Sequence, residues 1–217
     1  MAGLSSEDRS AIEKKFESLE DQVTILLHKP EGKEEHFDDF MAALEEICSM
    51  SDLLSHKDMV EMETDEDIIH DVDMFPALVL LDKDSNDHGI RFYGVPTNKT
   101  FTALIDTIEM FSTGDSGLEE EVREKIDSLE ENKLQVLCTP SVPDLERYLD
   151  NILRLSFVNE KVECAFVDLI QFPEVAEKYR VLDMPKTISN EDLKFTGVYD
   201  LEEIIEILSK KIGDAEG

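Results

Sequence analysis

The chain has 217 residues, with 21 Lys and Arg against 52 Asp and Glu, which gives a formal net charge of −31 at pH 7. This balance excludes general nucleic-acid binding, because a phosphate backbone is bound through neutralising Lys and Arg side chains, and it disfavours docking on anionic membranes. A hydrophobic fraction of 41% is enough for packed cores, so a disordered acidic chain is excluded as well.

No targeting or membrane-spanning segment is visible. No apolar run approaches the roughly 20 residues that cross a bilayer. Residues 1–9 lack the basic segment followed by an apolar stretch that is typical of a secretory signal. We therefore expect a cytoplasmic protein with no membrane partner.

In the first half, apolar residues at helical spacing, Ile12, Phe16 and Leu19, predict an amphipathic helix. A short aliphatic segment with turn residues on both sides follows and predicts a buried strand. The expected elements in chain order are a helix around 12–19, a strand at 23–27, a helix over 37–47, a weak strand at 59–62, a further helix, a proline-led hairpin of strands at 77–81 and 90–93, and a closing helix over 101–108.

The second half repeats this plan. Val122, Ile126 and Leu129 have the spacing of the first helix, and residues 181–185 match residues 72–76 around a proline. The expected elements are a helix around 122–129, a strand at 134–138, a helix over 145–153, a strand at 162–167, a short helix, a hairpin of 187–188 with 193–196, and a closing helix over 204–208.

In each half, a parallel βαβ unit followed by an antiparallel hairpin and a helix predicts a mixed four-stranded sheet flanked by helices, an α/β fold. The polar stretch at residues 112–117 is the natural boundary between the halves. We expect one domain at residues 1–116 and a second at residues 117–217.

The three cysteines, Cys48, Cys138 and Cys164, stand far apart in the sequence among apolar neighbours. No pair has the spacing of a redox dithiol or of a zinc knuckle. Free cysteine is among the most buried residue types, so we expect three inert core thiols. A lone reactive thiol at Cys138 or Cys48 stays open as an alternative.

Residues 166–181 and the following 184–187 resemble the stretch of thioredoxin-fold proteins that runs from the second strand, through a short helix ending in a tyrosine, to a cis-proline. Residues 90–96 resemble the hairpin that precedes the closing helix of a first domain. The tandem arrangement, with an added N-terminal helix, resembles the two-domain protein disulfide oxidoreductases of archaea, a glutaredoxin-like family. The resemblance implies two tandem thioredoxin-like domains over nearly the whole chain.

The chain departs from this family at the chemistry. Members carry Cys-x-x-Cys after the first strand of one or both domains, where a helix N-terminus stabilises the thiolate. Neither matching segment contains sulfur, and dithiol exchange needs an attacking thiolate and a resolving partner. The resemblance places the vacated positions at Gly32, Lys33, Glu34 and Glu35 in the first half and at Val142, Pro143, Asp144 and Leu145 in the second.

The resemblance also implies that Pro76 and Pro185 follow cis peptide bonds. In such proteins the backbone of the residue before this proline pairs with an extended peptide, and here Phe75 and Met184 take that place. An edge of this kind binds by β-augmentation. The alternative is that each proline only shapes the core and binds nothing.

No cofactor or metal site is expected. The nine glycines form no nucleotide-binding loop. Residues 82–93 begin like a calcium loop, but Asp87 replaces the required glycine and Tyr93 replaces the bidentate glutamate, so we expect a solvated turn.

The leading hypothesis is a redox-inactive tandem thioredoxin-fold protein that binds a protein or an extended peptide, or serves as a scaffold. One alternative is a residual thiol-disulfide oxidoreductase that works through a lone cysteine. Another is low-affinity cation binding by the acidic surface, and the acidity also suits a moderately salty cytoplasm. The sequence leaves the oligomeric state open.

Overall fold

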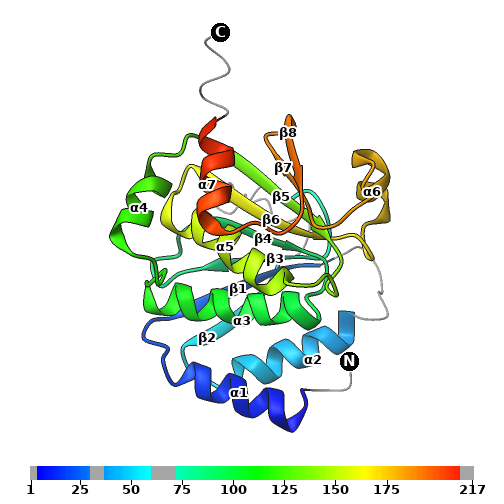
Figure 1. The fold of residues 1–217 in the computed structure, drawn as a ribbon. Coiled ribbons are helices and arrows are strands. Elements are labelled where there is room, and N and C mark those ends of the chain that lie inside the picture. Colours follow the sequence, from blue (N-terminus) through cyan, green and yellow to red (C-terminus); the bar gives the residue numbers. More distant parts are fainter. Residues whose placement is uncertain (1–3, 30–36, 60–71, 211–217) are drawn as a thin grey trace. The chain divides into compact units, whose positions relative to one another are not determined.

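The computed structural model describes residues 4–29, 37–59 and 72–210 (Figure 1). The chain forms two compact units. The first comprises Met1–Asp87, Phe92–Val95 and Ile105–Gly114, and the second comprises His88–Arg91, Pro96–Leu104 and Asp115–Gly217.

The described residues of the first half form three helices and four strands. Strand β1 is buried along most of its length, pairs in parallel with β2, and pairs antiparallel with β3. The elements are α1 (Ser6–Phe16), β1 (Val23–His28), α2 (Phe37–Cys48), β2 (Leu54–Met59), β3 (Ala77–Leu81), β4 (Asp87–Tyr93) and α3 (Asn98–Thr113).

In the second half, the part that the structure describes forms four helices and four strands. Strand β5 pairs in parallel with β6 and antiparallel with β7, and β7 pairs antiparallel with β8. The elements are α4 (Glu120–Asp127), β5 (Asn132–Cys138), α5 (Leu145–Val158), β6 (Val162–Asp168), α6 (Pro173–Tyr179), β7 (Lys186–Ser189), β8 (Leu193–Thr196) and α7 (Leu201–Lys210).

The two halves share one strand order. The first four strands run β2-β1-β3-β4, and the last four run β6-β5-β7-β8, which is the same arrangement of second, first, third and fourth strand. The described residues contain eight strands and seven helices in all. The predicted mixed α/β fold is confirmed, while the domain boundary after residue 116 stays a prediction.

The weak strand of the first half lies earlier than the sequence predicts. It spans Leu54–Met59 instead of starting at Met59, and the residues from 60 to 62 lie outside the described part. Strand β2 stands at the end of the strand order, and only Leu54 in it is buried. An edge strand needs no continuous apolar run, and for this reason its polar sequence was not recognised.

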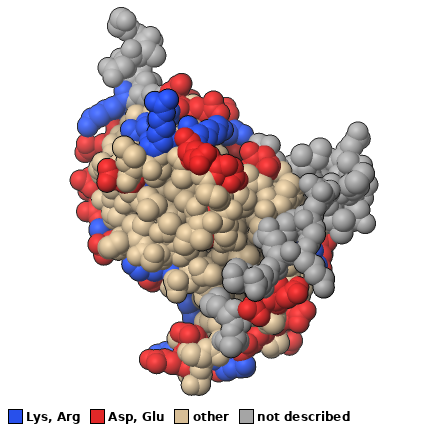
Figure 2. Space-filling view, turned by 90° about the vertical axis from the view of Figure 1, so that its right-hand side faces the viewer, with Lys and Arg blue, Asp and Glu red and all other residues tan. Residues whose placement is uncertain are grey.

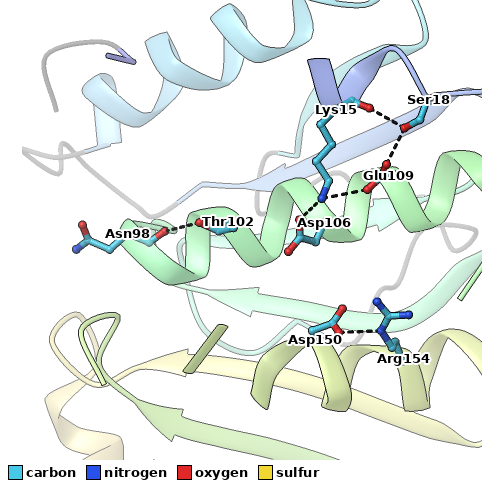
Figure 3. A network of polar contacts seen from close by, with 8 residues as sticks. All are labelled: Lys15, Ser18, Asn98, Thr102, Asp106, Glu109, Asp150 and Arg154. Carbon is cyan, nitrogen blue, oxygen red and sulfur yellow. Dashed lines mark hydrogen bonds and ion pairs between the residues drawn. The ribbon is translucent and has the colours of Figure 1, made fainter. Parts of the chain in front are cut away.

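Lys15 joins α1 to α3 in the first unit (Figure 3). Its ammonium group forms ion pairs with Asp106 and, at 3.0 Å, with Glu109. Ser18 donates its hydroxyl to a carboxylate oxygen of Glu109 at 2.7 Å. Ile12 and Phe16 of α1 are buried, so the polar contacts accompany an apolar face.

No described helix is both long enough and apolar enough to cross a membrane.

Candidate functional site

Two equivalent prolines lead into β3 and β7. The Phe75–Pro76 and Met184–Pro185 peptide bonds are both cis, as the resemblance implies. The carbonyl oxygen of Pro76 accepts the backbone N–H of Gly94 at 2.8 Å, and that of Pro185 accepts the N–H of Gly197 at 2.9 Å. The two halves of the repeat therefore share the same hydrogen bond between the proline and the glycine that follows the hairpin.

Met184 combines an exposed side chain with backbone groups that have no partner among the described residues. Its side chain is exposed, with 42% of the residue surface accessible, whereas Pro185 is buried. Among the residues that the structure describes, none forms a hydrogen bond with the backbone N–H or carbonyl oxygen of Met184. Backbone groups without partners beside an exposed apolar side chain are what an added strand pairs with.

Leu182 and Ile170 are also exposed, at 91% and 68%. Together with Met184 they are the large hydrophobic side chains that stay exposed in the described part of the chain. We call these three residues the apolar triad. Isolated apolar side chains on a surface are ordinary, and these three lie in the two segments that flank α6.

The fold holds the two segments of the triad in place. Asp168, which is 2% exposed at the end of β6, accepts the backbone N–H of Ile170 at 2.9 Å and the Gln171 amide at 2.7 Å. After α6, Arg180 takes a left-handed conformation at φ 49°, and Val181 donates its N–H to the carbonyl of Ala176 at 3.0 Å. Both ends of α6 are thereby closed by local hydrogen bonds.

Figure 1 shows α6 at one end of the strands, apart from α5 and α7, which lie over a face of the sheet. Figure 2 views the molecule from that side and shows a broad area of uncharged side chains with Lys, Arg, Asp and Glu gathered along its upper border. An uncharged area is unusual on a chain with 52 acidic residues.

The first-unit proline offers a less open edge. Phe75 is half-buried, and its ring is tilted against the imidazole of His28 with 6.4 Å between the centroids. Its proposed role in peptide pairing stays a prediction. Gly32, Lys33, Glu34 and Glu35, the expected first slot, lie outside the described residues.

The second slot is filled by apolar packing. Val142 is 8% exposed and Leu145, the first residue of α5, is fully buried. Pro143 and Asp144 are exposed between them, and Asp144 has a positive φ of 55° without capping the helix through its side chain. The ammonium group of Lys99 donates to the carbonyl oxygen of Val142 at 2.7 Å. The segment therefore holds a cation on its backbone and presents no nucleophile.

The three cysteines are free, and their surroundings suppress ionisation. Burial raises the pKa of Cys48, which is only partly buried, to about 11. Burial raises the pKa of Cys164 to about 12, and burial together with the charge of Asp168 raises that of Cys138 further. The expected burial is confirmed for Cys138 and Cys164.

Sequence reasoning missed Ile170, Leu182 and Lys99. Ile170 and Leu182 are apolar residues in the turns before and after a short helix, which is the signal that could have revealed them. Lys99 carries no such signal, because its partner Val142 is distant in sequence. Within the described residues, no three His, Cys, Asp or Glu side chains converge as metal ligands would.

No family model matches the chain, and no curated protein matches it. Among solved structures, the alkylhydroperoxide reductase AhpF of Enterococcus faecalis superposes with a TM-score of 0.87 at 21% identity over 94% of this chain and 99% of that one. A protein disulfide oxidoreductase from Aeropyrum pernix gives 0.82 at 20% identity, covering 95% and 93%. A Sulfolobus solfataricus protein gives 0.60 at 17% identity, covering 87% and 94%.

The Enterococcus and Aeropyrum structures are two-domain thioredoxin-fold proteins, so this chain has a tandem thioredoxin-like fold. At these identities the likeness establishes the fold alone.

Proposed function

We propose that this chain is a tandem thioredoxin-fold protein without dithiol chemistry that binds an extended segment of a partner protein beside Met184. The observation that carries the proposal is the exposed Met184, whose backbone N–H and carbonyl have no partner among the described residues. A strand that pairs there gains backbone hydrogen bonds, and the apolar triad supplies contacts for its side chains. A cytoplasmic location remains a prediction of the sequence.

The chemistry of the slot supports binding without exchange. Thiol–disulfide exchange needs a thiolate, a resolving thiol and access to a disulfide. Val142 and Leu145 supply neither thiol, and both are packed inside. A catalytic role for Cys138 or Cys48 has no observation in its favour, because burial keeps these thiols protonated at neutral pH.

The first test measures peptide binding. A fluorescent extended peptide of alternating apolar and polar residues is titrated with the wild-type chain and with Met184→Asp. The charge placed against the apolar triad is expected to weaken binding about tenfold, equivalent to about 1.4 kcal/mol. Ala11→Asp, which adds the same charge at an exposed position of α1, is the matched control and is expected to bind as wild type does.

The second test measures redox activity. Insulin reduction by the purified chain, with thioredoxin as the positive control, is expected to equal the rate without protein. Reduction above that rate would overturn the redox part of the proposal. Equal affinities of Met184→Asp and Ala11→Asp would overturn the binding part.

A further inference from the structure

Basic side chains gather around Tyr179 at the end of α6. The ammonium of Lys178 lies 4.8 Å from the centre of the Tyr179 ring, and that of Lys194 lies 5.9 Å from it. Lys186 donates its ammonium to the Tyr179 carbonyl oxygen at 2.8 Å. The exposed Arg180 follows directly in the chain. We call Lys178, Tyr179, Arg180, Lys186 and Lys194 the Tyr179 cluster.

Most of these cations have no carboxylate partner. Within the described part of the chain, Arg180, Lys186 and Lys194 form no ion pair, although acidic residues outnumber basic ones by 52 to 21. Acidic residues are present in the same segments but do not approach these cations closely enough to pair with them. They are Glu174, Glu177, Asp183, Glu191 and Asp192.

The cluster adjoins the proposed peptide edge. Leu182 and Met184 stand between Arg180 and Lys186 in the chain, so the apolar and basic groups belong to one short loop and the strand that follows it. A ligand that pairs with Met184 would therefore meet these cations as well.

We infer that the segment bound beside Met184 carries Asp or Glu side chains next to its apolar ones, and that the Tyr179 cluster recognises them. This inference rests on the proposed function. In an extended segment, successive side chains point to opposite faces, so apolar and acidic residues can reach different neighbours on the same surface. Arg and Lys then pair with the carboxylates of the partner.

The overall charge makes this recognition selective. A chain of charge −31 repels an acidic partner at long range, but at about 0.15 M salt the Debye length is about 8 Å, so distant carboxylates are screened. Contacts within the Tyr179 cluster are screened less. An acidic segment therefore has a favourable place to dock where cations gather, whereas a basic segment would be attracted to most of the surface.

The experiment compares two probes with the same apolar residues. One peptide alternates Val and Ile with Asp and Glu, and the other carries Asn and Gln in place of the acids. Their affinities are measured by fluorescence anisotropy at about 0.15 M salt. The acidic probe is expected to bind about fivefold more tightly, as a few exposed ion pairs provide.

The variant Arg180→Gln/Lys194→Gln removes two exposed cations of the cluster. It is expected to bind both probes with equal affinity. The matched control is Lys57→Gln/Lys161→Gln, which removes the same charge at two exposed positions elsewhere and is expected to keep the preference. Thermal melting checks that both double variants fold. If Arg180→Gln/Lys194→Gln does not fold, the single variant Lys194→Gln replaces it.

The outcomes separate the two proposals. Equal binding of the two probes by the wild-type chain, with Met184→Asp still weakening both, would overturn the acidic specificity and leave peptide binding in place. Equal loss of the preference in the control variant would also overturn it, because general charge would then be the cause. Failure of both probes to bind the wild-type chain would overturn the proposed function itself.

Discussion

Gly197 donates its backbone N–H to the carbonyl oxygen of Pro185 at 2.9 Å, which ties the end of the β7–β8 hairpin to the start of β7. Gly197 has a φ of 119°, which L side chains rarely adopt, and a Cβ added at this position would meet its nearest atom, in the Tyr199 ring, at an ordinary 3.7 Å. Backbone conformation, not space, thus requires glycine here.

Gly197→Ala is therefore expected to lower the free energy of unfolding by about 1–3 kcal/mol. Gly114→Ala is the control. The φ of Gly114 is 66°, in the left-handed region that other residues can enter, and a Cβ added at this position would have no neighbouring atom within 4 Å. The control is expected to cost about 1 kcal/mol. Urea denaturation measures both, and a larger loss in Gly114→Ala would contradict the reasoning.

A buried hydrogen bond joins α5 to β7. The hydroxyl groups of Tyr148 and Thr187 lie 2.6 Å apart, and both residues are fully buried. Tyr148→Phe leaves the Thr187 hydroxyl without this partner, so a loss of about 1–3 kcal/mol in the free energy of unfolding is expected. Tyr199→Phe, whose hydroxyl is exposed and donates to Thr196, is expected to lose less than about 0.5 kcal/mol.

The double variant Tyr148→Phe/Thr187→Val tests the cause. Replacing both partners removes the unpaired hydroxyl, so much of the lost stability is expected to return. Additive losses in the double variant would show that packing, not the hydrogen bond, is responsible.

The native thiols are expected to react slowly. With a pKa of about 11, Cys48 is almost entirely protonated at neutral pH, and Cys138 and Cys164 are buried as well. Alkylation at about pH 7.5 is expected to be about a hundredfold slower, or more, than in denaturant, where an ordinary pKa of about 8.5 applies. Mass spectrometry of the labelled chain measures the rate of alkylation. Rapid labelling of one thiol in the native chain would support the alternative of an oxidoreductase that works through a lone cysteine.

Placing two cysteines in the second slot is expected to introduce dithiol chemistry. Val142→Cys/Leu145→Cys places two thiols around the start of α5, where Leu145 is the first helical residue. A helix N-terminus favours a thiolate. The variant is expected to reduce insulin, whereas Val142→Cys alone lacks a resolving thiol and is expected to be inactive. An inactive double variant that folds would show that two thiols at these positions are not sufficient for dithiol chemistry.

Because Lys15 pairs with Glu109, we expect the free energy of unfolding to depend on pH. Burial would raise the pKa of Glu109, but hydrogen bonds from Ser18 and Lys15 outweigh it and hold that pKa below the usual value. A lowered carboxyl pKa in the folded state stabilises the protein above the unfolded pKa of about 4.3, and this stability is lost as pH falls through the folded value.

Lys15→Met is therefore expected to lower the free energy of unfolding at neutral pH by about 1 kcal/mol or less, since the pair is partly exposed. The difference from wild type is expected to shrink below about pH 4. Lys14→Met is the control, because the exposed Lys14 forms no ion pair among the described residues. A difference that stays constant from neutral to acid pH would exclude the pair as its source.

The sequence by itself determined the repeat, the mixed sheets and the absence of a dithiol. Strands such as Val23–His28 and Asn132–Cys138 are recognisable because most of their residues are buried, so apolar residues cluster in these short segments of the sequence. The sequence misplaced the polar edge strand Leu54–Met59, because only Leu54 in it is buried and the strand therefore has no cluster of apolar residues.

Tertiary structure alone decided which groups stay open. Met184 and Leu182 are apolar, as core residues are. The hydrogen-bonded turn after α6 places them in an exposed segment, and the sequence does not indicate this. The cations around Tyr179 come from α6, β7 and β8, and the sequence does not indicate that they converge. Local periodicity reports the environment within one element, whereas a binding surface depends on contacts between elements that only folding brings together.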